Sequence, residues 1–286
     1  MLIAILIFCN VILQVLFRLL PHYNVRNLNA ITINYFTCLL LGCTITSKWP
    51  FKASVLQEGW FPYAFTLSII FIIFFNVNAY SIQKVGMVIT SVFQKLSLVF
   101  PVILGLLFFG ESIRPLTYVA FPITVLAIML TQLPSGSSGP GLKAFKKYWH
   151  LPFLVILGSG IIEVVLFYIQ EKGITGTDNK EFTTSLFGMA GMWGLLSLAL
   201  KKQLDFNKNE FITGIAIGIP NFFTIYLILR GLELGWKGAI LFPTNNVGTI
   251  LFTALVGIFI FQEKLSRANY LGLVFALISV LLFSLS

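Results

Sequence analysis

The sequence predicts an all-α integral membrane protein, with ten transmembrane helices arranged as two inverted five-helix repeats. Of its 286 residues, 57% are hydrophobic and only 10% are charged, whereas a soluble domain carries about 25% charged residues. Apolar runs long enough to cross a bilayer as helices, roughly 20 residues each, recur along the chain. Motifs of the first half also return in the second half. These three observations predict the fold class.

Hydropathy predicts the individual spans, with charges, prolines and glycines as their boundaries. The short connections leave no room for a soluble domain. The apolar run begins at Met1 with no positively charged region ahead of it, so we interpret it as a membrane helix rather than a cleaved signal peptide. The predicted spans are 2–20, 28–47, 61–81, 87–109, 114–133, 151–170, 182–200, 211–232, 238–261 and 268–285.

A linker at 134–150 separates a first five-helix repeat at 1–133 from a second at 151–286. The linker starts Pro-Ser-Gly-Ser-Ser-Gly-Pro-Gly and continues as a short basic amphipathic run. It lacks the Gly-Lys-Ser/Thr junction of a phosphate-binding loop, and no predicted strand precedes it. We therefore interpret it as a flexible connector.

A constant offset relates the two predicted repeats. Glu111 and Glu263 are 263 − 111 = 152 residues apart, and the same offset pairs Gly86 with Gly238. An odd number of helices per repeat forces the second repeat to enter the membrane in the opposite direction. Inverted repeats are common in transporters, whose substrate lies near the midplane between the halves.

The segment from Pro101 to Glu111 reads Pro-Val-Ile-Leu-Gly-Leu-Leu-Phe-Phe-Gly-Glu and returns as Gly-Ile-Phe-Ile-Phe-Gln-Glu from Gly257 to Glu263. It resembles the signature of the EamA-type family in the drug/metabolite transporter (DMT) superfamily, with Gln262 where the family usually has Gly. The resemblance implies a five-plus-five duplication and a secondary transporter that moves a small metabolite by alternating access. Amino acids and other compounds with an anionic group are one substrate class that it implies. A nucleotide-sugar or sugar-phosphate exchanger is the alternative.

Two ionisable residues stand well inside predicted spans. Lys95 lies about eight residues into the fourth span, and its repeat counterpart is the apolar Val247. A lysine at that depth costs roughly 2.5–3.5 kcal/mol on insertion scales, so it requires a partner or a task. We predict that Lys95 anchors an anionic group of the substrate; a structural ion pair is the alternative. Glu163 in the sixth span is interpreted either as the partner of Lys95 or as a proton site that couples transport to a gradient.

Amide and hydroxyl groups inside the spans form a further polar set. Asn10 and Gln14 are four residues apart and share a helix face, as do Asn76 and Tyr80. Such groups either bond neighbouring helices or line a wet cavity, and together we expect them to line the cavity. The predicted substrate-binding residues are Lys95, Gln94, Asn10, Gln14, Asn76, Tyr80, Asn221, Asn245 and Asn246.

Other classes of function fit the sequence less well. The histidines, His22 and His150, lie at helix ends or in the linker, and Asp178 and Asp205 lie in polar loops. This pattern predicts no catalytic residues, no metal site and no cofactor. The net charge of +9 is scattered through short loops, which favours anionic lipid headgroups over nucleic acid as its counterpart. A channel is the remaining alternative among membrane proteins.

The expected partners are the lipid bilayer, a small-molecule substrate, and a coupling proton or counter-substrate. Orientation is left open by the sequence. Loops after odd-numbered spans hold more Lys and Arg than loops after even-numbered spans, which predicts both termini outside. The family resemblance instead implies both termini in the cytoplasm, and we expect a bacterial cytoplasmic membrane. Substrate identity, transport direction and oligomeric state also stay open.

Overall fold

A computed structural model describes residues 1–47, 49–85, 87–110, 115–131, 147–175, 179–260 and 266–285. Within these ranges the chain is helical and contains no strands. The repeat-related residues Glu111, Glu263 and Gly86, and the linker from 134 to 146, lie outside the described residues. Six of the described helices are long and apolar enough to cross a membrane, judged by length and composition, and four shorter apolar helices accompany them.

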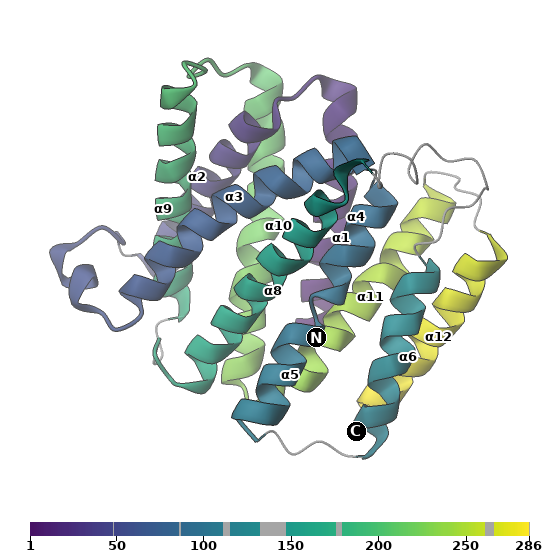
Figure 1. Ribbon diagram of the computed structural model, residues 1–286. Helices are drawn as coiled ribbons and strands as arrows, with labels where there is room; N and C mark the ends of the chain where they lie inside the picture. The colour runs from purple at the N-terminus through teal and green to yellow at the C-terminus, as the bar shows by residue number, and fades with distance from the viewer. Residues whose placement is uncertain are drawn as a thin grey trace. The chain divides into compact units, whose positions relative to one another are not determined.

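Helix positions agree with the predicted spans within a few residues, except in the fourth span. Two short 3-10 helices, η1 and η2, lie in the connections. The helices are α1 Leu2–Leu19, α2 Asn27–Thr46, α3 Phe61–Val85, α4 Met87–Leu96, α5 Val99–Phe108, α6 Pro115–Thr131, α8 His150–Glu171, α9 Asn179–Leu200, α10 Lys208–Glu233, α11 Gly238–Phe259 and α12 Arg267–Ser284 (Figure 1).

The fourth span was expected as one helix over 87–109, and it is instead two helices, α4 and α5, with a break at Ser97 and Leu98. Pro101 provides the physical reason. It has no backbone N–H to donate to the Ser97 carbonyl four residues earlier, and its ring crowds that carbonyl. The Ser97 carbonyl accepts instead from the Phe100 N–H, at 3.0 Å. The backbone turns tightly at the break.

The described chain forms two compact units, which are treated separately. The first unit contains residues 1–76 and 165–234, and the second contains residues 77–164 and 235–286. Each unit therefore combines helices from both halves of the sequence. Helices α3 and α8 are each divided between the two units, α3 after Asn76 and α8 after Val164.

In the first unit, α2 packs between α9 and α10 (Figure 1). Glycines allow this close approach, because a Cβ on Gly194 would lie 2.5 Å from Thr32 Oγ1 and one on Gly191 would lie 3.2 Å from the Phe36 ring. Gly42 makes the corresponding contact with Thr184. Residue numbers rise on α2 as they fall on α9, so the two helices run antiparallel.

Helix α10 runs parallel to α2. Gly214 lies against Ile33, and Gly218 lies against Thr37 four residues further along both helices. Small residues at such positions let helix backbones approach closely, which is the main source of packing energy between helices in lipid. The register between α2 and α10 is therefore set by two glycines one helical turn apart.

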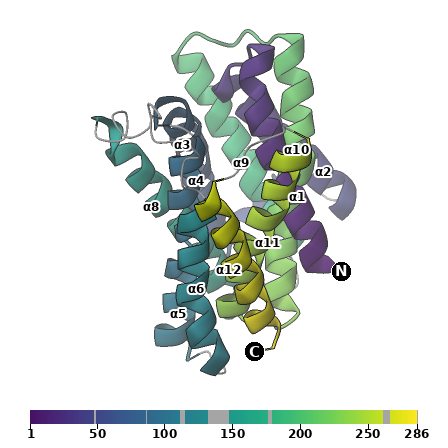
Figure 2. The same ribbon diagram turned by 90° about the vertical axis from the view of Figure 1, so that its right-hand side faces the viewer.

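In the second unit, α6 and α12 lie side by side (Figure 2). Asn269 near the start of α12 donates from Nδ2 to the Leu130 carbonyl near the end of α6, at 3.1 Å. Ala127 and Ala276 share a buried apolar cluster one to two turns away. These contacts make α6 and α12 antiparallel. Helix α11 packs against α5, α6 and α12 and completes this core.

Candidate functional site

The second unit holds the most deeply buried lysine among the described residues. Lys95 is 8% exposed, on the last turn of α4. Its Nζ donates to Asn246 Oδ1 of α11 at 3.3 Å, and Asn246 is itself buried. The lysine and the amide come from corresponding spans of the two sequence halves. The structure thus brings two of the predicted site residues into direct contact.

Glu163 of α8 belongs to the same cluster. Its Oε2 lies 3.0 Å from Ser97 Oγ, in the break between α4 and α5. Lys95 lies two residues before Ser97, on the last turn of α4. Both interpretations made from the sequence, a partner for Lys95 and a proton site, are compatible with this position. The cluster therefore contains one cation, one carboxylate and two neutral polar groups.

Ser97 was not among the predicted site residues. The sequence signal that could have identified it is Pro101, which interrupts the helix four residues later. In the break, the N–H groups of Ser97 and Leu98 bond to carbonyls only three residues back, at 3.4 Å to Gln94 and 3.5 Å to Lys95. The Ser97 side chain points toward α8, where its hydroxyl contacts Glu163. The helix break thus contributes a functional group as well as a bend.

Two threonines of α11, Thr244 and Thr253, carry buried hydroxyls that are unpartnered among the described residues, and only Thr253 shares a helix face with Asn246. Thr253 lies seven residues after Asn246 and so occupies the same helix face. The hydroxyl oxygens of Thr253 and Thr244 are buried and have no hydrogen-bond partner within the described chain. Asn245, which is also buried, points about 100° away from Asn246, and its carbonyl accepts from Thr249 Oγ1 at 2.7 Å.

The two other predicted residues of this unit lie beside the cluster. Gln94 is half-buried, and its carbonyl accepts from Ser97 Oγ at 2.7 Å. Tyr80 is 46% exposed, with the Lys84 ammonium 5.5 Å from its ring centre. Gln94 therefore contributes to the cluster through its backbone, whereas Tyr80 makes none of the contacts described for Lys95.

The remaining predicted residues lie in the first unit. Asn221 Nδ2 donates to Asn34 Oδ1 at 3.1 Å, which joins α10 to α2. Asn10 and Asn76 each donate to a carbonyl four residues earlier in their own helix, those of Leu6 and Ile72. Gln14 is half-buried. For Asn221, helix-to-helix bonding is thus the use seen in the structure.

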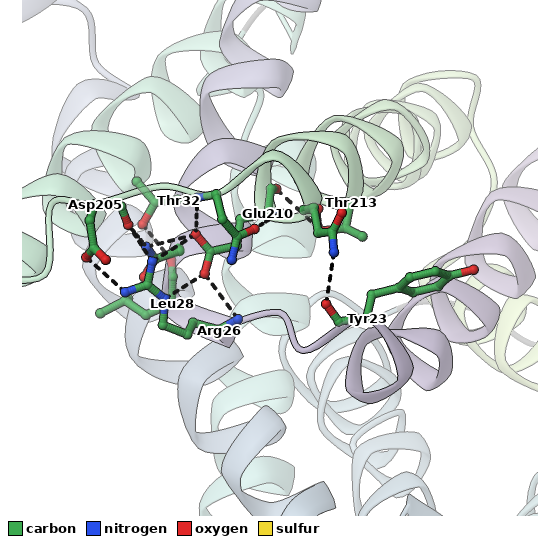
Figure 3. Close-up of polar contacts among 10 residues, drawn as sticks. Tyr23, Arg26, Leu28, Thr32, Asp205, Glu210 and Thr213 are labelled. Carbon is green, nitrogen blue, oxygen red and sulfur yellow. Dashed lines mark hydrogen bonds and ion pairs between the residues drawn. The ribbon is translucent and has the colours of Figure 1, made fainter.

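An ionic cluster at one end of α10 was missed entirely from the sequence (Figure 3). Arg26, just before α2, donates from Nε to Glu210 Oε1 at 2.6 Å and from Nη1 to Asp205 Oδ1 at 2.9 Å. Asn29 Nδ2 adds a bond of 2.7 Å to the Asp205 carbonyl. The hydrogen bond that the Arg26 guanidinium donates to the Asp205 carboxylate is the main cause that lowers the pKa of Asp205. The cluster ties α2 to α10.

The local sequence did contain a signal for part of this cluster. Asn207 and Glu210 form a capping box at the start of α10: the Glu210 N–H donates to Asn207 Oδ1 at 2.8 Å, and the Asn207 N–H donates to Glu210 Oε2 at 2.9 Å. An Asn followed three residues later by Glu ahead of an apolar run is a typical helix start. Arg26 lies 184 residues away from Glu210 along the chain, so its part in the cluster had no local signal.

No group of three or more His, Cys, Asp or Glu side chains suited to a metal ion occurs in the part of the chain that the structure describes. The chemistry available at the Lys95 cluster is therefore that of an ammonium, a carboxylate, an amide and hydroxyls. An ammonium with neutral hydrogen-bonding neighbours is suited to hold an anionic group.

Two comparisons with known proteins cover nearly the whole chain. An uncharacterized protein of Haemophilus influenzae is 23% identical over 284 residues, which cover 96% of this chain and 94% of that protein. A chain in a crystal structure has a TM-score of 0.71 at 12% identity, with 98% of this chain and 96% of that chain covered. At this identity the likeness concerns the fold alone.

The family comparison concerns the first half of the chain. The model of the EamA-like transporter family matches residues 1–133, the range in which the signature from Pro101 to Glu111 was noted. Together with the apolar helices, this match supports an integral, multi-pass membrane protein. Residues 1–133 therefore match the EamA-like transporter family, which is part of the drug/metabolite transporter superfamily.

Proposed function

We propose that this protein is a secondary transporter that moves a small metabolite bearing an anionic group, such as an amino acid, across a bacterial cytoplasmic membrane by alternating access. The observation that carries the proposal is Lys95, which is buried and bonded to the neutral amide of Asn246. The family match of residues 1–133 supports transport as the general activity.

The bonding of Lys95 supports its role as a substrate anchor. An ammonium has three N–H donors, and among the described residues only Asn246 accepts a hydrogen bond from it. A buried charged group with donors left over carries a large desolvation penalty. A carboxylate or phosphate group of a substrate would accept hydrogen bonds from these donors.

We further propose that the chain spans the membrane ten times, as two inverted repeats. The support comes from helices that correspond in the two halves. Helices α2 and α9 are the second of each half and run antiparallel, and α6 and α12 are the fifth of each half and also run antiparallel. A two-fold axis in the membrane plane relates corresponding helices in opposite directions, so inverted repeats are expected to give this arrangement.

A ligand-stabilisation screen tests the proposed substrate class. Purified protein is heated with amino acids, other carboxylates, sugar phosphates and nucleotide sugars, because a ligand that favours the folded state raises the melting temperature. We expect a compound with an anionic group to stabilise the wild type and to lose most of this effect in Lys95→Gln. Lys84→Gln, which removes an exposed lysine of the same unit, is the matched control and should respond as the wild type does.

A flux assay separates a carrier from a pore. With the stabilising compound inside and outside reconstituted vesicles, a transporter gives saturable flux that is accelerated by substrate on the opposite side. A sugar phosphate or nucleotide sugar as the stabilising compound favours the exchanger alternative. Unsaturable conductance would contradict the transporter proposal.

A further inference from the structure

In the contact between Ser97 and Glu163, one hydroxyl faces two acceptors, and one of them is a carboxylate. Ser97 Oγ lies 2.7 Å from the Gln94 carbonyl oxygen and 3.0 Å from Glu163 Oε2. A serine hydroxyl has a single proton to donate and two lone pairs with which to accept. It can therefore donate to only one of these oxygens at a time.

The two arrangements of that proton correspond to the two protonation states of Glu163. When Glu163 is ionised, Ser97 donates to the carboxylate. When Glu163 is protonated, its O–H donates to Ser97 Oγ, and Ser97 donates to the Gln94 carbonyl. Both states are hydrogen-bonded without movement of the backbone.

Lys95 supplies the charge that selects between these states. Lys95 lies on the last turn of α4, two residues before Ser97, and Ser97 in turn contacts Glu163. The ammonium donates a hydrogen bond to the neutral amide of Asn246. This bond does not neutralise its positive charge, which can therefore attract an anion other than Glu163. A substrate anion at Lys95 and an ionised Glu163 would compete for one positive charge.

We propose that Glu163 is a proton-binding site coupled to the anion site at Lys95. Glu163 is ionised while Lys95 balances its charge, and it takes up one proton from water when the anionic group of a substrate occupies Lys95. No covalent bond of the substrate changes; one anion and one proton enter together, and the net charge of the cluster stays constant. The proposal rests on the proposed function, which it deepens by naming a carboxylate or phosphate anion co-bound with a proton.

Infrared spectroscopy can test the link between the two residues without any substrate. The full chain is reconstituted in phosphatidylcholine vesicles and titrated from pH 5 to pH 9, and the protonated carboxyl band of Glu163 is identified by its loss in Glu163→Gln. In Lys95→Gln we expect the midpoint of this band to move to higher pH by about one unit or more, a tenfold change in proton affinity. Lys84→Gln should leave the midpoint unchanged.

A second variant covers the case in which Lys95→Gln does not fold. Ser97→Ala removes the donor to the ionised carboxylate and should also move the midpoint to higher pH, whereas Ser159→Ala, on the same helix as Glu163, should not. An equal midpoint in the wild type, Lys95→Gln and Ser97→Ala would overturn the proposal.

The anion side is tested with acetate, glycine, L-glutamate and inorganic phosphate as probes of thermal stability at pH 6 and pH 8. We expect an anion that requires Lys95 to bind more tightly at pH 6 than at pH 8, and this difference to disappear in Glu163→Gln. Binding that requires Lys95 but does not depend on pH would refute the proton coupling and leave the substrate anchor standing. If no anion binds, the proposed function itself fails, while the infrared titration still reports on Glu163.

Discussion

Arg26 and Glu210 are joined by a hydrogen bond of 2.6 Å between Nε and Oε1, although 184 residues separate them. The Glu210 side chain is fully buried, whereas that of Arg26 is 40% exposed. The pair connects the start of α2 to the start of α10. The negative charge of the buried Glu210 carboxylate is balanced by the Arg26 guanidinium within the first unit.

Replacing Arg26 should therefore destabilise the protein. Arg26→Gln removes the guanidinium from the buried Glu210 carboxylate, which keeps three neutral donors: Asn29 Nδ2, the Asn207 N–H and the backbone N–H of residue 26. We expect a lower free energy of unfolding than in the wild type, because the buried Glu210 carboxylate loses the cation that balances its charge. Unfolding in detergent measures this loss. Lys208→Gln, an exposed change on the same helix, is the control, and an equal effect of both variants would contradict the prediction.

The contact between Arg26 and Asp205 predicts that the stability of the folded protein depends on pH in the acidic range. The pKa of Asp205 is lowered in the folded protein, so this carboxylate contributes stability above its unfolded pKa of about 3.9. The contribution is lost as the pH falls through the folded value. The melting temperatures of wild type and Asp205→Asn should differ at pH 6 and converge below pH 4. If the two melting temperatures still differed below pH 4, the negative charge of Asp205 would not be the source of the difference.

The glycine contacts of α2 and α9 predict a steric effect. In Gly194→Ala the new Cβ would lie 2.5 Å from Thr32 Oγ1, so one helix must shift. We expect a loss of roughly 1–3 kcal/mol. Gly59→Ala, with no atom within 4 Å of the new Cβ, should have little effect. Adding Thr32→Ala to Gly194→Ala should recover part of the stability, and the absence of recovery would mean that the helices do not meet as described.

A double-mutant cycle separates the two readings of the Lys95 cluster. If Lys95 serves the substrate, Lys95→Gln should abolish anion-dependent stabilisation with little loss of folding, because Glu163 can take up a proton. If Lys95 and Glu163 are mainly structural partners, Lys95→Gln alone should be strongly destabilising, and the added Glu163→Gln should restore much of the loss. Unchanged transport together with such a rescue would end the idea of a substrate anchor.

The sequence by itself determined the helical class and nearly all helix positions. Apolar runs of the length of a bilayer can satisfy their backbone hydrogen bonds only as helices, so composition and hydropathy suffice. The positions of Lys95 and Glu163 within apolar runs were also readable from the sequence, because a charged residue stands out in such a run. The signature around Pro101 identified the family that residues 1–133 match.

Only the tertiary structure decided which side chains meet. Asn246 lies 151 residues from Lys95, and Glu210 lies 184 residues from Arg26, and no helical period relates residues that far apart. The amides show the same limit: Asn246 contacts Lys95 whereas Asn221 bonds Asn34, although the sequence presents both as polar residues near a proline. Helix register, set by where small residues let backbones approach, makes that difference.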